Sequence, residues 1–389
     1  MNGAGAPAKI SRFVELDSLR GLAALTVVLY HLQFLWTEEA PPTSTAVRWF
    51  CAQVAPFGTE AVMLFFVLSG FVLSLPAVNG RPQPYFTFLI RRIFRIYVPY
   101  LAAIAVSVAG AFWLHGIVTQ SVWFRQSWSE PVNWRLVGQH LLFVGTYDTN
   151  QFDNPIWSLV QEMRISLIFP GLCWLVLQLK SRWSAAIAAG LTVIAFALNK
   201  WPLLVHWQLP ESLFYAALFV LGIALARERK SLSAWFLHLQ QSVKILIAAA
   251  CLWLYLFAGP ELTNDHGSFF AHALWFIAHW ATALGAGGLI VISFNSAWFQ
   301  KILTWPPIHL LGKMSYSLYL WHFVVLLYCI HLLYGRTPLW AIVCLTFVLT
   351  LLVSWCSYRW IELPSIVFGR KLSDMRSSPP RQSTLAVTR

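Results

Sequence analysis

Long apolar runs, separated by short polar and mostly basic segments, dominate the chain. Taking about 20 apolar residues as one crossing of the hydrocarbon core, the pattern predicts ten membrane-spanning helices. Their approximate ranges are 16–36, 57–76, 96–114, 155–179, 184–200, 211–227, 245–260, 270–294, 315–335 and 338–360. A further apolar piece from Leu136 to Gly145 is too short to cross, so it is expected to lie in the interface or re-enter. The predicted fold class is therefore all-α, a polytopic membrane protein.

The polar segments set the expected domains and orientation. Residues 14–364 form one transmembrane domain, residues 1–13 an amino tail, and residues 365–389, rich in Ser, Pro and Arg, a disordered tail. With the N-terminus inside, 21 Lys and Arg fall on the inner side, five fall outside, and Arg164 lies within a span. Because cytoplasmic flanks accumulate basic residues, both termini and both tails are expected in the cytoplasm.

Composition narrows the class further. Of 389 residues, 58% are hydrophobic and 11% charged, against roughly 45–50% and 25% in soluble domains, which excludes an ordinary cytosolic enzyme. A nucleic-acid binder would gather the net charge of +12 on one polar face, whereas here the charges flank apolar runs, so no nucleic acid is expected. The six cysteines show no CxxC pair and no regular spacing, so neither a disulfide framework nor a metal site is predicted.

Ionisable residues within the spans are the candidate chemistry, since a charge in hydrocarbon is costly unless it faces a cavity or a partner. Arg20 and His31 are eleven residues apart, which places both on one helix face roughly 16 Å apart along the axis. Asp17 precedes Arg20 by three residues and can pair with it. The plainer interpretation makes Asp17 and Arg20 interface anchors and His31 a structural bond to a neighbouring helix.

Glu162 lies about 10 Å inside the outer end of its span, and His31 lies about 8 Å inside the outer end of the first span. Matching depth predicts a base, His31, oriented by Glu162, as acyl-transfer chemistry requires. A purely structural interhelical bond is the alternative. Arg164 is about 200° round the helix from Glu162, so it must find a different partner or cavity.

Two further groups face the inner side. Ser315, Tyr319 and His322 form one polar stripe that either lines a cavity or joins helices. Arg91, Arg92 and Arg95 share about one helical turn. They suit bidentate phosphate capture, although a positive-inside flank needs some of these charges anyway.

Six segments together resemble, in the right order, the signatures of the integral-membrane acyltransferase-three family over about residues 14–364. They are LDSLRGLAALTVVLYH, FFVLSGFVLS, RRIFRIYVPY, WSLVQEMRISLIFP, LGKMSYSLYLWH and SYRWIELP. The resemblance implies a bacterial inner-membrane O-acyltransferase of about ten helices. Such enzymes move an acyl group, most often acetyl, from cytoplasmic acyl-CoA to a hydroxyl of a surface carbohydrate or lipid-linked glycan. Some members carry a fused soluble esterase-like domain, which is not expected here.

The resemblance also implies roles. Arg20 and His31 match a motif of a basic residue, ten spacers and a histidine, with His31 as catalytic base or transient acyl carrier. Arg92 and Arg95 match a paired-arginine motif for the donor phosphates. Further matches are Glu162 after the Trp-Ser-Leu triplet, Ser69, Gly70 and Phe71 in the second span, Tyr316, Tyr319 and His322 in the ninth, and Glu362 in the closing segment. Many members have an aromatic pair where Ile165 and Ser166 stand, which bears on the acceptor.

The candidate sites follow from these considerations. The expected catalytic residues are His31, Glu162, Arg20 and Asp17, and the expected donor-binding residues are Arg91, Arg92, Arg95, Ser315, Tyr319 and His322. The expected partners are acyl-CoA, a carbohydrate or glycolipid acceptor, and membrane lipid. The competing classes are a proton-coupled transporter or glycan flippase, in which His and Glu relay protons, and a membrane scaffold or sensor without turnover.

Overall fold

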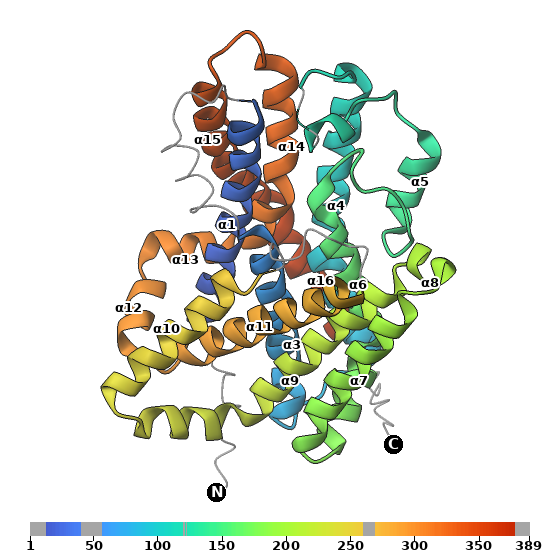
Figure 1. The fold of residues 1–389 in the computed structure, drawn as a ribbon. Helices are drawn as coiled ribbons and strands as arrows, with labels where there is room; N and C mark the ends of the chain where they lie inside the picture. The colour runs from blue at the N-terminus through green and yellow to red at the C-terminus, as the bar shows by residue number, and fades with distance from the viewer. Residues whose placement is uncertain (1–12, 40–56, 120, 122, 260–268, 378–389) are drawn as a thin grey trace, which may run out of the picture.

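The computed structural model describes residues 13–39, 57–119, 121, 123–259 and 269–377. Within these ranges the chain forms helices joined by short connections, and no strand occurs (Figure 1). The longer helices are α1 (Val14–Glu39), α3 (Gly58–Val78), α4 (Tyr85–Leu114), α6 (Trp157–Gln178), α7 (Arg182–Leu198), α9 (Leu209–His238), α10 (Gln241–Phe257), α11 (Phe269–Ser293), α14 (Ser315–Leu333), α15 (Leu339–Ser357) and α16 (Leu363–Ser377). The short ones are η1 (Phe124–Gln126), α5 (Trp134–Leu142), η2 (Asn154–Ile156), α8 (Pro202–His206), α12 (Ala297–Leu303), α13 (Pro306–Lys313) and a π-helical turn, η4 (Tyr358–Glu362).

Each of the ten predicted spans falls on one of these helices. Eight helical segments are long and apolar enough to cross a membrane, and α7 and α10 are apolar helices of 17 residues. Apolar runs form helices because hydrocarbon offers the backbone no hydrogen-bond partner, so each segment must satisfy its own groups. The predicted class, an all-α polytopic membrane protein, is confirmed.

The structure departs from the predicted carboxyl-terminal tail. Residues 365–377 were expected to be disordered, yet they belong to α16. Their apolar and small residues pack on α4, with the Phe368 and Phe94 ring centroids 5.2 Å apart, and this tertiary contact orders a segment whose composition alone favours disorder. Residues 1–12 and 378–389 of the two expected tails lie outside the described residues.

The segment between α4 and α6 contains a short helix where an interfacial piece was predicted. The side chain of Asn133 caps α5 by accepting hydrogen bonds from the backbone N–H groups of Arg135 and Leu136. Leu136 and His140 are buried, whereas Trp134 and Leu142 are largely exposed. The helix therefore has one packed face and one open apolar face, as an interfacial helix requires.

Two glycines allow α3 and α9 to cross in close contact. A Cβ on Gly70 would lie 2.2 Å from the backbone oxygen of Phe219, and one on Gly222 would lie 2.2 Å from that of Val67. Small residues at helix crossings let backbones approach in this way inside membranes. Gly70 thereby fixes the rotation of α3, and the adjacent Ser69 faces the cavity described below.

Helix α1 packs against α14, and α14 packs against α15 (Figure 1). The three helices come from opposite ends of the chain, so the first and ninth predicted spans are neighbours in space. This arrangement brings the histidines of α1 and α14 together.

Candidate active site

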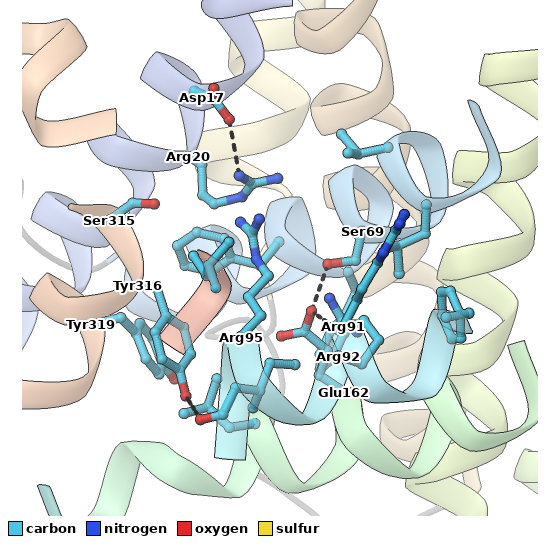
Figure 2. Close-up of a pocket in the computed structure, with 18 of the residues that line it drawn as sticks. Asp17, Arg20, Ser69, Arg91, Arg92, Arg95, Glu162, Ser315, Tyr316 and Tyr319 are labelled. Atoms are coloured by element: carbon cyan, nitrogen blue, oxygen red, sulfur yellow. Dashed lines mark hydrogen bonds and ion pairs between the residues drawn. The ribbon is translucent and has the colours of Figure 1, made fainter. Parts of the chain in front are cut away.

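A cavity of about 450 Å³ lies between α1, α3, α4, α6, α14 and α16. Its polar lining comprises Asp17, Arg20, Ser69, Gln83, Arg91, Arg92, Arg95, Ser158, Glu162, Ser315, Tyr316, Tyr319 and Arg370. Figure 2 labels these residues except Gln83, Ser158 and Arg370. Five arginines thus face two carboxylates. An excess of buried and half-buried positive charge needs an anion, so the cavity is suited to a phosphate-bearing or carboxylate ligand.

Arg20 and Arg95 bring positive charge into the cavity. They come from α1 and α4 and point into the same space (Figure 2). Arg20 Nη1 lies 3.3 Å from Asp17 Oδ1, which is the pairing predicted from their spacing. Arg95 is half-buried and makes no hydrogen bond or ion pair within the described residues. Its guanidinium is therefore available to a ligand.

Arg92 and Glu162 form a fixed pair in the cavity wall. Arg92 Nη2 donates to Glu162 Oε1 at 2.6 Å, and Arg92 Nε donates to Ser166 at 3.1 Å. Ser69 donates to the same carboxylate oxygen at 3.0 Å. The side chains are only 7% and 18% exposed, and a buried charge pair persists when hydrogen bonds satisfy both partners. Ser166, which stands at one of the atypical positions, thus secures the arginine.

The expected contact between Glu162 and His31 is not formed. Glu162 binds Ser69 and Arg92 instead. Depth along two helices places residues at a common level, but it leaves open which helices are neighbours and how each is rotated. Glu162 is therefore part of the arginine-lined wall of the cavity, where it binds Arg92.

The three arginines of α4 are also divided. Arg92 is bound to Glu162, whereas Arg91 donates to Ser373 at 2.9 Å and to Asp374 at 2.7 Å, both on α16. Of the three arginines of α4, Arg95 alone makes no hydrogen bond or ion pair with a described residue. The three arginines expected to bind the donor phosphates thus all line the cavity but have different partners.

His31 pairs with His322 across the α1–α14 contact. His31 Nδ1 lies 3.2 Å from His322 Nε2 and 2.9 Å from the Val27 carbonyl oxygen. His322 Nδ1 lies 2.6 Å from the carbonyl oxygen of Tyr319. Both rings are buried.

These contacts select the tautomers. A carbonyl oxygen only accepts, so His322 Nδ1 carries a hydrogen and its Nε2 is the acceptor in the neutral ring. His31 Nδ1 must then carry the hydrogen, which it shares between Val27 and His322. The lone pair of His31 consequently resides on Nε2, which has no hydrogen bond to a described residue. A base or nucleophile needs such a nitrogen.

Tyr319 separates the cavity from this histidine pair. Its hydroxyl lies 2.7 Å from Ser158 Oγ and donates to the Pro155 carbonyl oxygen at 2.8 Å. Ser315 and Tyr319 line the cavity as predicted, whereas His322 is not among the described lining residues and contacts His31 instead. The polar stripe of α14 therefore begins in the cavity and ends at the histidines.

Arg164, Tyr316 and Glu362, which the sequence also singled out, form hydrogen bonds to other segments. Arg164 donates to the carbonyl oxygens of Val144 and Gly145 at 3.0 and 2.6 Å, which supplies the separate partner its position required. Tyr316 donates to the Ile96 carbonyl oxygen at 2.7 Å, and Glu362 accepts from Ser317 at 2.7 Å. These bonds hold α4, α14 and the π-helical turn together.

Sequence reasoning missed three polar residues of the cavity lining, which are Gln83, Ser158 and Arg370. Ser158 lies in the Trp-Ser-Leu triplet, but its bond to Tyr319 joins residues far apart in the chain. Arg370 was assigned to a disordered tail; the spacing of Ile366 and Arg370, one turn apart, was the available signal for a helix face. Within the described residues, no group of three or more His, Cys, Asp or Glu could hold a metal ion.

Comparison with known proteins identifies the family to which the chain belongs. Residues 13–359 match the family model described as an acyltransferase domain. A Bacillus subtilis protein named provisionally as a peptidoglycan O-acetyltransferase, YrhL, is 25% identical over 380 residues, covering 90% of this chain and 54% of that protein. Peptidoglycan O-acetyltransferase OatA of Listeria monocytogenes is 22% identical over 366 residues, covering 90% and 55%. No solved structure matches the chain.

The chain spans slightly more than half the length of these curated relatives. The family match nevertheless covers nearly the whole transmembrane domain, including both histidines, the arginines of α4 and Glu162. The chain belongs to the integral-membrane acyltransferase family 3.

Proposed function

We propose that the protein is a membrane O-acyltransferase. It moves an acyl group, acetyl by preference, from cytoplasmic acyl-CoA to a hydroxyl of a cell-surface or lipid-linked carbohydrate. The observation that carries this proposal is an arginine-lined cavity that ends at Tyr319, whose backbone bonds the His322–His31 pair. The cavity provides a binding site for an anionic donor, and the histidines provide a base next to it.

The donor enters from the cytoplasm, because the preference of cytoplasmic segments for Lys and Arg supports a cytoplasmic opening at the arginine end of the cavity. Coenzyme A has several phosphate groups on its nucleotide part, and a long, uncharged pantetheine arm extends from them to the thiol. Arg95 and Arg20 bind phosphate oxygens by charge-assisted hydrogen bonds, while Arg92 stays with Glu162 and keeps the wall rigid. The arm then follows α14 past Ser315 to Tyr319. The thioester reaches His31 when the Tyr319 side chain moves aside.

Transfer uses the free nitrogen of His31. Nε2 takes the proton of the acceptor hydroxyl as its oxygen attacks the thioester carbonyl carbon, which forms the new C–O bond. The C–S bond breaks, and the departing thiolate of coenzyme A recovers the proton from the imidazolium. If His31 carries the acyl group first, the same nitrogen attacks the thioester carbonyl carbon and the C–S bond breaks, so that coenzyme A leaves as the thiolate. The acceptor oxygen then attacks the acyl carbon, the N–C bond to His31 breaks, and the proton of the acceptor hydroxyl passes to the coenzyme A thiolate. His322 holds His31 in the required tautomer through the 3.2 Å contact.

The acceptor approaches from the outer side. The names of the relatives point to a glycan of the peptidoglycan type, so we place it first among the acceptors. The protein accordingly functions in the bacterial cytoplasmic membrane, where acyl-CoA and surface-glycan precursors lie on opposite sides of one bilayer.

The test is a turnover assay with the purified full chain in nanodiscs. Labelled acetyl-CoA is supplied with peptidoglycan fragments or total envelope glycolipid, and both coenzyme A release and label on carbohydrate are followed. The proposal predicts both signals for the wild type and neither for His31→Ala. His331→Gln is a matched control, because His331 lies on α14 with the same type of backbone bond, Nδ1 to the Leu327 carbonyl oxygen at 2.9 Å, away from His31.

The same preparation distinguishes a transporter. If labelled glycan crosses the bilayer of a proteoliposome while coenzyme A is neither bound nor released, the acyltransferase proposal is wrong. Coenzyme A release in step with glycan labelling excludes that alternative.

A further inference from the structure

Helix α16 is fixed to the arginine-bearing part of α4, although it begins after the segment matched by the family model, residues 13–359. A Cβ on Gly369 would lie 2.5 Å from Phe94 Cβ, so the two helices approach closely there. The Ser365 hydroxyl donates to the Phe94 carbonyl oxygen. The helix is therefore part of the folded domain, and its polar face has a defined position.

That polar face borders the donor cavity. Ile366 and Arg370, one turn apart, line the cavity from α16. Arg370 is exposed, and its guanidinium makes no hydrogen bond or ion pair with any described residue. One turn further, Asp374 accepts from Arg91 at 2.7 Å. One face of α16 thus carries Arg370, whose guanidinium is unpaired among the described residues, and Asp374, whose carboxylate binds Arg91.

The two ion pairs of the cavity differ in how firmly they are held. The Arg92–Glu162 pair is 7% and 18% exposed, whereas the Arg91–Asp374 pair is 35% and 66% exposed. Solvent screens an exposed pair and leaves it little net stability. A phosphate carries more charge than a carboxylate and suits the planar guanidinium fork. Arg91 can therefore exchange Asp374 for a phosphate, while Arg92 keeps Glu162.

We propose that α16 completes the entrance of the cavity as a phosphate-binding element: Arg370 binds a phosphate group of the donor, and Asp374 is an internal anion that this phosphate displaces from Arg91. The inference rests on the proposed function for the identity of the donor. It adds a helix outside the family-matched segment to the donor site, and it assigns opposite effects to two neighbouring residues of that helix.

The experiment measures acetyl-CoA binding to the purified full chain by isothermal titration calorimetry. Arg370→Ala should weaken the Kd by about tenfold, the usual loss for one charge-assisted hydrogen bond. Asp374→Asn should tighten the Kd about twofold to fivefold, because a weak competing pair is removed. Lys371→Ala is the matched control, since Lys371 is an exposed cation of the same helix that does not line the cavity. It should bind as the wild type does.

A donor without phosphates isolates the effect. With S-acetylpantetheine, the wild type, Arg370→Ala and Asp374→Asn should bind equally. An Arg370→Ala variant that binds acetyl-CoA like the wild type, or an Asp374→Asn variant that binds it more weakly, overturns the inference. A loss by Arg370→Ala that is equally large with S-acetylpantetheine also overturns it, because the effect would then be structural.

Inorganic diphosphate separates this inference from the proposed function. If the wild type turns over acetyl-CoA but Arg370→Ala and Asp374→Asn leave diphosphate and acetyl-CoA binding unchanged, the role of α16 is wrong and the proposed function stands. If no acyl-CoA is turned over, yet diphosphate binds with the predicted opposite responses of the two variants, the anion site stands and the acyltransferase proposal fails.

Discussion

The arginine end of the site, which is the cavity itself, and the histidine end, which is the His31–His322 pair beyond Tyr319, are built in opposite ways. At the arginine end, Arg95 and Arg370 are unpaired among the described residues, and Arg91 is held by a carboxylate that is 66% exposed. At the histidine end, the rings of His31 and His322 are buried, and each is bonded to a backbone carbonyl of its own helix. The arginine end carries charged groups whose partners can exchange, whereas the histidine end holds two neutral rings in place by hydrogen bonds.

The difference fits the two tasks of the proposed transferase. Binding a flexible, highly charged donor tolerates exchangeable partners, because several guanidiniums share the phosphates. Proton transfer depends on the protonation state and orientation of one nitrogen, so its surroundings must be held in place. The two ends should accordingly respond to mutation in different observables, and the following substitutions test that division.

The largest effect is expected from removing His31, the proposed base. His31→Ala should lower kcat by about 100-fold to 10,000-fold, the range contributed by general acid–base catalysis. Coenzyme A release and glycan labelling measure it together. His331→Gln should retain wild-type turnover, and an equal loss in that control would assign the effect to folding.

Substituting Arg95 and Arg92 one at a time separates donor binding from protein stability. Arg95→Ala should raise the KM for acetyl-CoA by about tenfold to a hundredfold and leave the apparent melting temperature unchanged, because Arg95 has no described partner to lose. Arg92→Ala leaves Glu162 buried without its cation, so it should cost about 3 kcal/mol of stability. Thermal unfolding in detergent and donor titration measure both. Equal melting temperatures for the two variants would contradict the division of these arginines.

A smaller loss is expected when His31 loses its partner. His322→Phe keeps an aromatic ring but removes the acceptor, so kcat should fall about tenfold, the cost of one hydrogen bond. The KM for acetyl-CoA should not change, because His322 does not line the donor cavity. His322→Gln retains an acceptor oxygen and should recover part of the rate. A rise in KM with unchanged kcat would instead show that His322 contributes to donor binding.

Sequence periodicity predicted much of this molecule. It located the ten apolar helices, the Asp17–Arg20 pair and the need of Arg164 for a separate partner, because these depend on residues close in the chain. It paired His31 with the wrong residue, since the distance of a residue from a helix end does not determine which helix is adjacent. His322, 291 positions away from His31, became its partner only through the packing of α1 on α14.

The C-terminal helix shows a second limit. The polar composition after residue 364 favours disorder, whereas contacts with α4, among them the packing of Gly369 and Phe368 on Phe94, make α16 part of the domain. Local composition describes a segment in isolation. The contacts that order α16 come from α4, more than 270 positions earlier for the Ser365–Phe94 bond.

The smallest effect concerns the loop next to the histidine end. Asp153 is fully buried, and both of its carboxylate oxygens lack a partner among the described residues. Burial raises the pKa of this carboxyl well above its usual value of 3.8. A raised pKa means that the folded state keeps a proton that the unfolded chain releases, so the carboxyl destabilises the fold as pH rises above about 4.

Asp153→Asn removes that penalty. It should raise the apparent melting temperature by a few degrees at pH 8 and by less at pH 5, with little change in turnover. Thermal unfolding at the two pH values measures the difference. A variant that is less stable than the wild type at pH 8 would show that the carboxylate has an ionic partner.

The most direct test of the division between the two ends is the Kd of acetyl-CoA for His31→Ala, measured on the same preparation that lacks turnover. The account predicts a Kd equal to that of the wild type, because the donor phosphates bind at the arginine end and His31 does not line the cavity. A variant that loses donor binding together with turnover would contradict it.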